Sequence, residues 1–251
     1  MSELAFDFTK MLREIDDFSA IAKPFLAERS DVIFTQYRQN LESIRRGKSD
    51  SMSPWSLPED RPLVTRPSVG EYEVQPRCGE LTVVAKISSK WEIRCPKEKG
   101  AKSVAQRHFN LCGTASTKVK LFSIDDTGTE TCIGTWHADL GDAQSPGCHF
   151  HVQVLQDDEF IPFPPALSVP RFPAIFCTPL SVVEFVLGEM FQSDWQRRST
   201  THSPELASWS GIQKTSLGNL LDWQRQTVTD ARFSPWSALK EVKPTSGMFV
   251  S

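Results

Sequence analysis

Two blocks of proline divide the chain into segments with different apolar periods. Five prolines fall within residues 48–79 and six within residues 162–179, and proline both removes a backbone donor and interrupts helices and central strands. Outside the two blocks apolar residues recur at helical spacing, whereas between them they alternate as in strands. The sequence therefore predicts an α+β protein with helices at both ends and strands in the middle.

We expect a single domain over residues 1–251 with five parts. Helices are predicted over residues 1–47 and 180–240, where Thr178 and Ser203, each followed by proline, mark two helix starts. The parts between the helices are a proline-rich connector (48–79), an antiparallel meander of four to five strands (80–160) and a proline-rich strap (161–179). This order favours a sheet with one face covered by helices.

Composition limits the environment that the chain suits. Hydrophobic residues make up 39% of it, enough for a core, and the net charge of −3 gives no general attraction to nucleic acid or membranes. The N-terminus lacks a basic segment followed by an apolar run, and no stretch approaches the roughly 18 apolar residues of a membrane span. The six cysteines include no CxxC pair. We expect a soluble, cytoplasmic protein with reduced thiols and no membrane partner.

Histidines concentrate on two neighbouring predicted strands. One strand runs through His137 and the next through His149, His151 and Gln153, and both alternate polar with apolar residues. If they pair as a hairpin, both apolar faces must enter the same core, so opposed residue numbers must sum to an even total. This parity predicts His137 beside His149 or His151, on one sheet face.

Three clustered imidazoles are typical of a zinc site that leaves one position open for water. His137, His149 and His151 are the expected ligands, with Asp139 and Gln153 as the nearest groups to orient them. A zinc-bound water acts as hydroxide near neutral pH, so this interpretation predicts a metal-dependent hydrolase.

The segment His149-Phe-His151-Val-Gln153-Val-Leu also resembles the signature of the histidine-triad nucleotidyl hydrolases and transferases. The resemblance implies that His151 attacks a phosphoryl group, that His149 orients it and that Gln153 hydrogen-bonds the phosphate. Two further interpretations stay open. The histidines could form a pH-sensitive surface, or they could be hydrogen-bonded structural residues on a covered face.

Charge is segregated along the predicted meander. Residues 86–120 hold nine basic and two acidic residues, whereas residues 121–160 hold eight acidic residues and no Lys or Arg. The basic segment, with Trp91 and Phe109 interleaved, is a candidate grip for a nucleic-acid backbone. We favour the alternative that oppositely charged neighbouring strands pair across the sheet.

Common catalytic signatures are missing from the sequence, including a phosphate loop, GxSxG, HExxH and a Gly-rich dinucleotide fingerprint. The leading interpretation is a binding or assembly protein without an evident catalytic site, whose partner is another protein. The order of helices and meander resembles the ubiquitin-conjugating (RWD-like) fold, which implies a non-catalytic interaction domain because no His-Pro-Asn precedes a cysteine. The rival is an enzyme acting through His137, His149 and His151.

Overall fold

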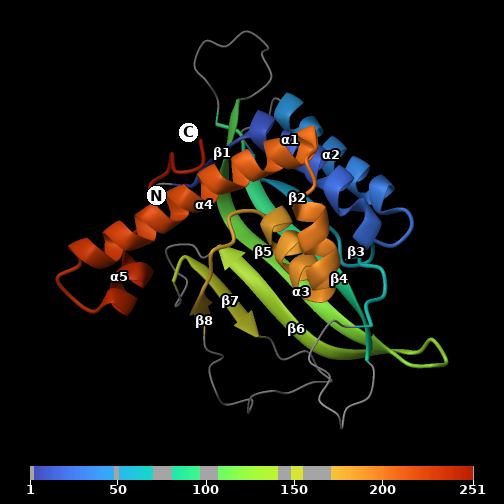
Figure 1. Ribbon diagram of the computed structural model, residues 1–251. Helices are drawn as coiled ribbons and strands as arrows, with labels where there is room; N and C mark the ends of the chain where they lie inside the picture. The colour runs from blue at the N-terminus through green and yellow to red at the C-terminus, as the bar shows by residue number, and fades with distance from the viewer. Residues whose placement is uncertain are drawn as a thin grey trace.

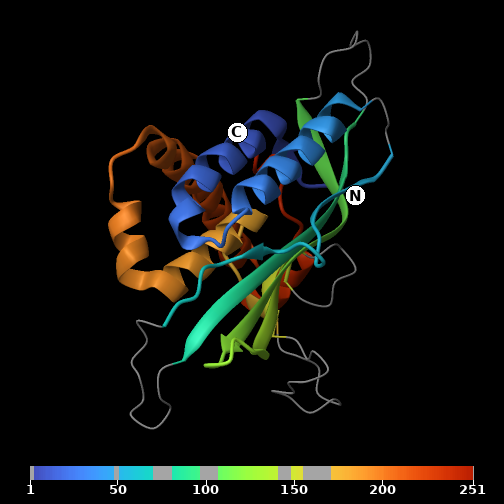
Figure 2. The ribbon, with the colours of Figure 1, turned by 90° about the vertical axis from the view of Figure 1, so that its right-hand side faces the viewer.

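The computed structural model describes residues 3–47, 51–69, 81–96, 107–140, 148–154 and 171–250. Helices α1 to α4 all lie on one side of a twisted antiparallel sheet (Figures 1 and 2). The predicted α+β class is confirmed, and so is the expectation that helices cover one face. Among the described residues, no helix has the length and apolar character to cross a bilayer.

The sheet of the described residues has eight strands, in the order β2-β4-β5-β6-β7-β8, with β1 added to β5 and β3 to β4. The strands are β1 (Ala5–Asp7), β2 (Ser53–Leu57), β3 (Leu63–Val64), β4 (Thr82–Arg94), β5 (His108–Ile124), β6 (Glu130–Leu140), β7 (Phe150–Val154) and β8 (Arg171–Pro173). The prediction of four to five strands was too low. The predicted meander corresponds to β4–β7, and the additional strands have only two to five residues, too short to show a period.

Part of the proline-rich connector belongs to the sheet, because β2 pairs with β4 along its length. Proline is tolerated there since β2 is an edge strand, which needs ladder donors on one side only. Trp55 of β2 is fully buried. Its ring stacks on Tyr37 with centroids 4.4 Å apart, and its Nε1–H donates to the Tyr37 carbonyl at 3.1 Å. Trp55 thus attaches the connector to the helical layer.

The helices are α1 (Phe8–Ala22), the 3-10 turn η1 (Lys23–Phe25), α2 (Ser30–Arg46), α3 (Pro179–Ser199), α4 (Pro204–Asp230) and α5 (Pro235–Glu241). Both predicted caps are confirmed. Thr178 accepts from the Ser181 N–H at 3.3 Å, and Ser203 accepts from the Leu206 N–H at 3.1 Å. These caps satisfy backbone donors that would otherwise be unpaired in the first turn.

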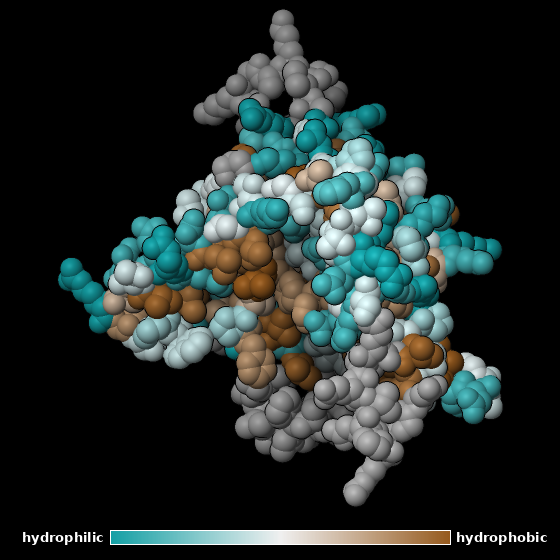
Figure 3. Space-filling model, in the orientation of Figure 1, coloured by the Kyte–Doolittle hydropathy of each residue, from teal (hydrophilic) through white to brown (hydrophobic). Residues whose placement is uncertain are grey.

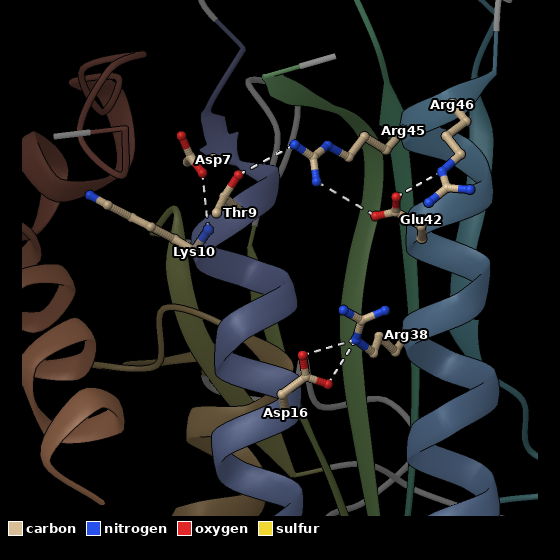
Figure 4. Close-up of polar contacts among 8 residues, drawn as sticks. All are labelled: Asp7, Thr9, Lys10, Asp16, Arg38, Glu42, Arg45 and Arg46. Carbon is tan, nitrogen blue, oxygen red and sulfur yellow. Dashed lines mark hydrogen bonds and ion pairs between the residues drawn. The ribbon is translucent and has the colours of Figure 1, made fainter. Parts of the chain in front are cut away.

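Charged side chains link α1 and α2 on their exposed side (Figure 4). Arg38 Nε of α2 donates to the Asp16 carboxylate of α1 at 2.7 Å, and within α2 Arg46 Nε donates to Glu42 at 2.8 Å. Such solvent-exposed pairs contribute only about 0–1 kcal/mol each, so burial of apolar side chains accounts for most of the helix packing. This surface carries both signs of charge and is no basic patch.

The last described segment packs beside the first. Phe249 stacks on Phe6 with ring centroids 4.9 Å apart, and the Ala5 N–H donates to the Ser246 carbonyl at 2.8 Å. Asn219 of α4 holds this segment from the other side, because its Nδ2 donates to the Met248 carbonyl at 2.8 Å. The two end segments are therefore joined in one corner of the core.

Candidate functional site

Strand alternation separates a buried face of the sheet from an open one. In β4 and β5 the odd-numbered side chains, such as Trp91 and Val119, are buried under the helices, whereas Lys90 and Lys118 point to the opposite face. This follows from the two-residue period of a strand. The open face is consequently polar along its whole width.

A hollow of about 890 Å³ lies on this open face. Six strands contribute to it, and its lining is mostly polar or charged. The polar lining residues are Ser56, Glu59, Ser88, Ser89, Lys90, Glu92, Thr114, Ser116, Lys118, His137, Asp139, His151, Gln153 and Arg171. A volume of this size falls within the range of roughly 300–1,000 Å³ that is usual for small-ligand sites.

Strand register arranges these side chains in two parallel rows. The first row runs through Lys118, His137, Gln153 and Arg171 on β5–β8. The second row runs through Lys90, Ser116, Asp139 and His151 on β4–β7. Residues opposed across antiparallel strands have Cβ atoms about 4.5–5.5 Å apart, so each row is a continuous set of neighbours.

His151 is the most buried polar residue of the hollow, with 3% of its surface exposed. Its Nδ1–H donates to the Cys148 carbonyl at 2.8 Å, and its Nε2 lies 3.6 Å from Asp139 Oδ2. Burial lowers the pKa of His151, and the Cys148 carbonyl and Asp139 oppose that effect only in part. His151 is accordingly a neutral imidazole at pH 7, with Nε2 available as an acceptor.

Some buried polar atoms of the hollow have no hydrogen-bond partner among the described residues. They include Asp139 Oδ1, an acceptor, and Arg171 Nε, a donor. Buried polar groups are nearly always hydrogen-bonded in proteins, and an exception calls for a partner that the chain itself does not provide. One acceptor and one donor thus remain for an external group.

At the other end of the hollow the charges are compensated. Glu92 accepts from the Thr114 N–H at 2.7 Å and lies 3.6 Å from Lys90 Nζ. The Thr114 hydrogen bond is the main reason that the pKa of Glu92 lies below its usual value. Glu92 folds over Gly113, where a Cβ atom would approach its Oε2 to 2.2 Å. A side chain at position 113 would therefore displace the Glu92 side chain.

The three predicted histidines do not all line one site, because His137 and His151 line the hollow and His149 does not. The parity prediction is confirmed, since all opposed pairs of β6 and β7 sum to an even number, but His137 faces Gln153 rather than His149 or His151. His149 precedes the first residue of β7, and its ring lies 6.3 Å from that of Trp223 in α4. It is not a lining residue of the hollow.

Both catalytic interpretations depend on a particular arrangement of the histidines. Among the described residues there is no group of three or more His, Cys, Asp or Glu side chains that could hold a metal ion, so the expected zinc set of His137, His149 and His151 is not seen. The histidine-triad interpretation needs His149 and His151 on one strand face beside Gln153. Of these three residues, His151 and Gln153 line the hollow and His149 does not.

Sequence reasoning missed Ser116, Lys118 and Arg171 as site residues. Ser116 and Lys118 could have been found from the alternation of β5, because both lie at even-numbered positions that point to the open face of the sheet. Arg171 lies on a three-residue strand within the predicted strap and had no such signal. Ser116 Oγ lies 3.3 Å from His137 Nδ1, which links the two rows.

Several basic side chains of β4 and β5 pair with carboxylates, of which only Glu130 belongs to residues 121–160. Lys86 pairs with Glu130 of β6, and Lys118 Nζ lies 3.6 Å from Glu59. Arg94 at the end of β4 pairs with Glu3. These pairs offset part of the positive charge in the described portion of residues 86–120.

Apolar side chains gather on the helical side of the molecule, over α4, α5 and the neighbourhood of β8 (Figure 3). The exposed ones include Phe172 in β8, Leu221 in α4 and Trp236 in α5. We call this set the apolar patch. Larger apolar patches on soluble proteins commonly mark contact surfaces.

No protein-family model, curated protein or solved structure matches the chain.

Proposed function

We propose that this chain is a binding protein without catalytic activity that holds a small polar ligand in the hollow of the open sheet face. The observation that carries the proposal is the pair of buried, unpartnered atoms in this hollow, Asp139 Oδ1 and Arg171 Nε. Leaving such groups unmatched costs roughly 1–3 kcal/mol each, and a ligand that pairs with both regains that free energy. The polar lining and the volume of the hollow agree with such a ligand.

Binding is favoured over catalysis by the position of Ser116. Its hydroxyl contacts His137, as a nucleophile would contact its base, but Ser116 lies in mid-strand between Lys90 and Asp139, within the ladders on both sides. Its backbone N–H belongs to the sheet and does not form an oxyanion hole, which normally supplies much of the rate of acyl transfer. The Ser116–His137 contact supports positioning of a ligand.

The test uses a variant that fills the hollow. Ser116→Trp places a large side chain on the open face and leaves the helix-covered face intact. We would measure the melting temperature with defined amino acids, sugars, nucleotides, organic acids and inorganic anions. A ligand at 100 times its Kd stabilises by about 2.7 kcal/mol, which raises Tm by roughly 5–10 °C.

The proposal expects at least one class to raise the Tm of the wild type and not that of Ser116→Trp. It is wrong if no class raises Tm, or if every shift persists in the filled variant. Circular dichroism of the variant checks that it folds, and Thr114→Trp, at a more exposed lining position, replaces it if it does not.

A second candidate function is assembly with another protein through the apolar patch. The specific observation is the exposure of Trp236, 66% of whose surface is open, together with Phe172 and Leu221. Light scattering coupled to size exclusion tests self-association. The Trp236→Ser/Leu221→Ser double variant should abolish any dimer that the wild type forms, and a monomeric wild type restricts this candidate to a different protein as partner.

A further inference from the structure

Nitrogen-bearing side chains stand next to one another across the open face, one on each of four neighbouring strands. They form the first row: Lys118, His137, Gln153 and Arg171. Neighbouring strands lie about 4.8 Å apart, so the row spans about 14 Å between its first and last strand. All four side chains carry N–H donors. A row of donors suits a ligand rich in oxygen acceptors.

The row carries a cation at each end. Arg171 Nε is buried and has no hydrogen-bond partner among the described residues. Lys118 Nζ lies 3.6 Å from Glu59, which also lines the hollow and has 67% of its side chain exposed. An anionic ligand that spans the row therefore meets a positive charge at both ends.

The second row adds a condition on the ligand. Asp139 Oδ1 is buried beside the donor row and can only accept a hydrogen bond. The nearby His151 Nε2 does not supply a proton while the imidazole is neutral, because its proton lies on Nδ1, toward Cys148. An anion without a hydroxyl group would place an acceptor oxygen against Asp139 Oδ1, which is itself an acceptor. A hydroxyl group on the ligand would donate to Asp139 and resolve the conflict.

On the premise that the hollow is a ligand site, we infer that it binds a small hydroxylated organic anion. The phosphate or carboxylate oxygens of this ligand lie along Lys118, His137, Gln153 and Arg171, and its hydroxyl donates to Asp139. The planar guanidinium of Arg171 suits either oxyanion, since it offers two parallel donors to two oxygens. Phosphate esters and hydroxycarboxylates share this chemistry, and binding experiments separate them.

Isothermal titration calorimetry with two matched acids tests the hydroxyl requirement. Citrate and tricarballylate both carry three carboxylates, and only citrate carries a hydroxyl. Glycerol 3-phosphate is the hydroxylated phosphate ester. We expect citrate to bind at least 10-fold more tightly than tricarballylate, because a buried acceptor left unpaired by the ligand weakens binding strongly. In Asp139→Asn, whose amide can itself donate, this preference should shrink to less than threefold.

The donor row is tested with Arg171→Ala, which we expect to weaken binding of the preferred anion at least 10-fold. Arg171→Lys keeps the positive charge without the two parallel donors of the guanidinium. Its affinity for the anion should lie between those of the wild type and Arg171→Ala. Arg225→Ala, an exposed arginine on α4, is the control and should bind as the wild type does. If Arg171→Ala does not fold, Lys118→Gln tests the other end of the same row.

Each outcome of these binding experiments either supports or overturns the inference. Binding of glycerol 3-phosphate alone, or of citrate alone, supports the inference and identifies the oxyanion. Equal binding of citrate and tricarballylate overturns the hydroxyl requirement. If only neutral sugars or amines bind, and Ser116→Trp abolishes that binding, the anion inference is wrong while the binding function stands. Binding of a single-stranded oligonucleotide without any small anion overturns the small-ligand inference. If no compound binds, the proposed function fails as well.

Discussion

The carboxylate of Asp139 and the imidazole of His151 lie opposite each other on β6 and β7, with Oδ2 and Nε2 3.6 Å apart. A backbone carbonyl can only accept a hydrogen bond, so the 2.8 Å contact of His151 Nδ1 with the Cys148 carbonyl fixes the proton on Nδ1. The pair becomes an ion pair only when His151 takes up a second proton. The protonation state of His151 therefore depends on both Cys148 and Asp139.

We expect Asp139→Asn to lower the pKa of His151 further. The carboxylate is one of the groups that oppose the effect of burial, and the substitution removes its charge while keeping its shape. An NMR titration of the His151 Cε1–H signal measures the change. Asp222→Asn on α4 is the control, because Asp222 is exposed and pairs with Arg225. An unchanged His151 titration would show that the two groups do not interact.

Acid should destabilise the fold through His151. Its pKa is lowered in the folded state, so below the ordinary histidine value of about 6.5 the unfolded chain binds the proton more readily than the folded one. The free energy of unfolding then decreases as pH falls through 6.5 toward the folded pKa. His151→Gln should lose less stability than the wild type between pH 7.5 and 5.5 in urea unfolding. An identical loss would contradict this assignment.

A rise in pH from about 4.5 to about 8 should destabilise the fold through Glu14 of α1, which is 3% exposed. Burial raises its pKa to about 8, and hydrogen bonds to Thr178 and Gln213 offset this only in part. The folded protein thus retains a proton that the unfolded chain releases near 4.5, and the free energy of unfolding decreases from about pH 4.5 to pH 8.

Glu14→Gln should remove this dependence and stabilise the protein above pH 8 by a few kcal/mol, on the order expected for a shift of several pKa units. Urea unfolding at pH 5 and pH 9 measures it. Glu28→Gln, at an exposed position, should behave as the wild type does at both values. A Glu14→Gln protein that is no more stable than the wild type at pH 9 would show that the carboxylate is better solvated than its burial indicates.

Two tryptophans provide a matched test of the packing. Trp55→Ala should cost about 3–5 kcal/mol, because it removes a fully buried ring, its stack on Tyr37 and its hydrogen bond. Trp236→Ala should change stability by about 0.5 kcal/mol or less, since that side chain is largely exposed. Denaturant midpoints of the two variants provide the comparison. Equal costs would be incompatible with β2 as an integral strand.

We expect the purified protein to bind no stoichiometric zinc through His137, His149 and His151. The ring of His149 lies against Trp223, and His137 faces Gln153. Elemental analysis after zinc loading and desalting is the measurement. One zinc per chain that disappears in a His149→Ala/His151→Ala double variant would restore the metal interpretation.

Local patterns in the sequence predicted much of the fold. Alternation in the long strands, and the proline after Thr178 and Ser203, are properties of neighbouring residues, and the structure confirms them. Strand parity was also correct, because both apolar faces must enter one core. What could not be predicted was the register within that parity, which places Gln153 opposite His137. Register depends on the connection between two strands and on packing against other elements.

The hollow was beyond sequence reasoning for a related reason. Its lining comes from six strands, two of which, β2 and β8, have five residues or fewer and contain proline. Sequence pattern alone does not reveal that β8 adds to the edge beside β7, and so Arg171 was not recognised. The histidines attracted attention because they are rare residues, whereas the atoms without hydrogen bonds, Asp139 Oδ1 and Arg171 Nε, are distinguished only by their burial.

The pairing of Phe6 with Phe249 makes the two end segments support each other. Each ring covers the other, and Phe6 also contacts Trp91 of β4, at a centroid distance of 5.2 Å. Shortening either segment would therefore expose the same aromatic corner to water. Fraying at one end should also loosen the other, so the two distant stretches of chain should exchange their amide hydrogens as a single cooperative unit.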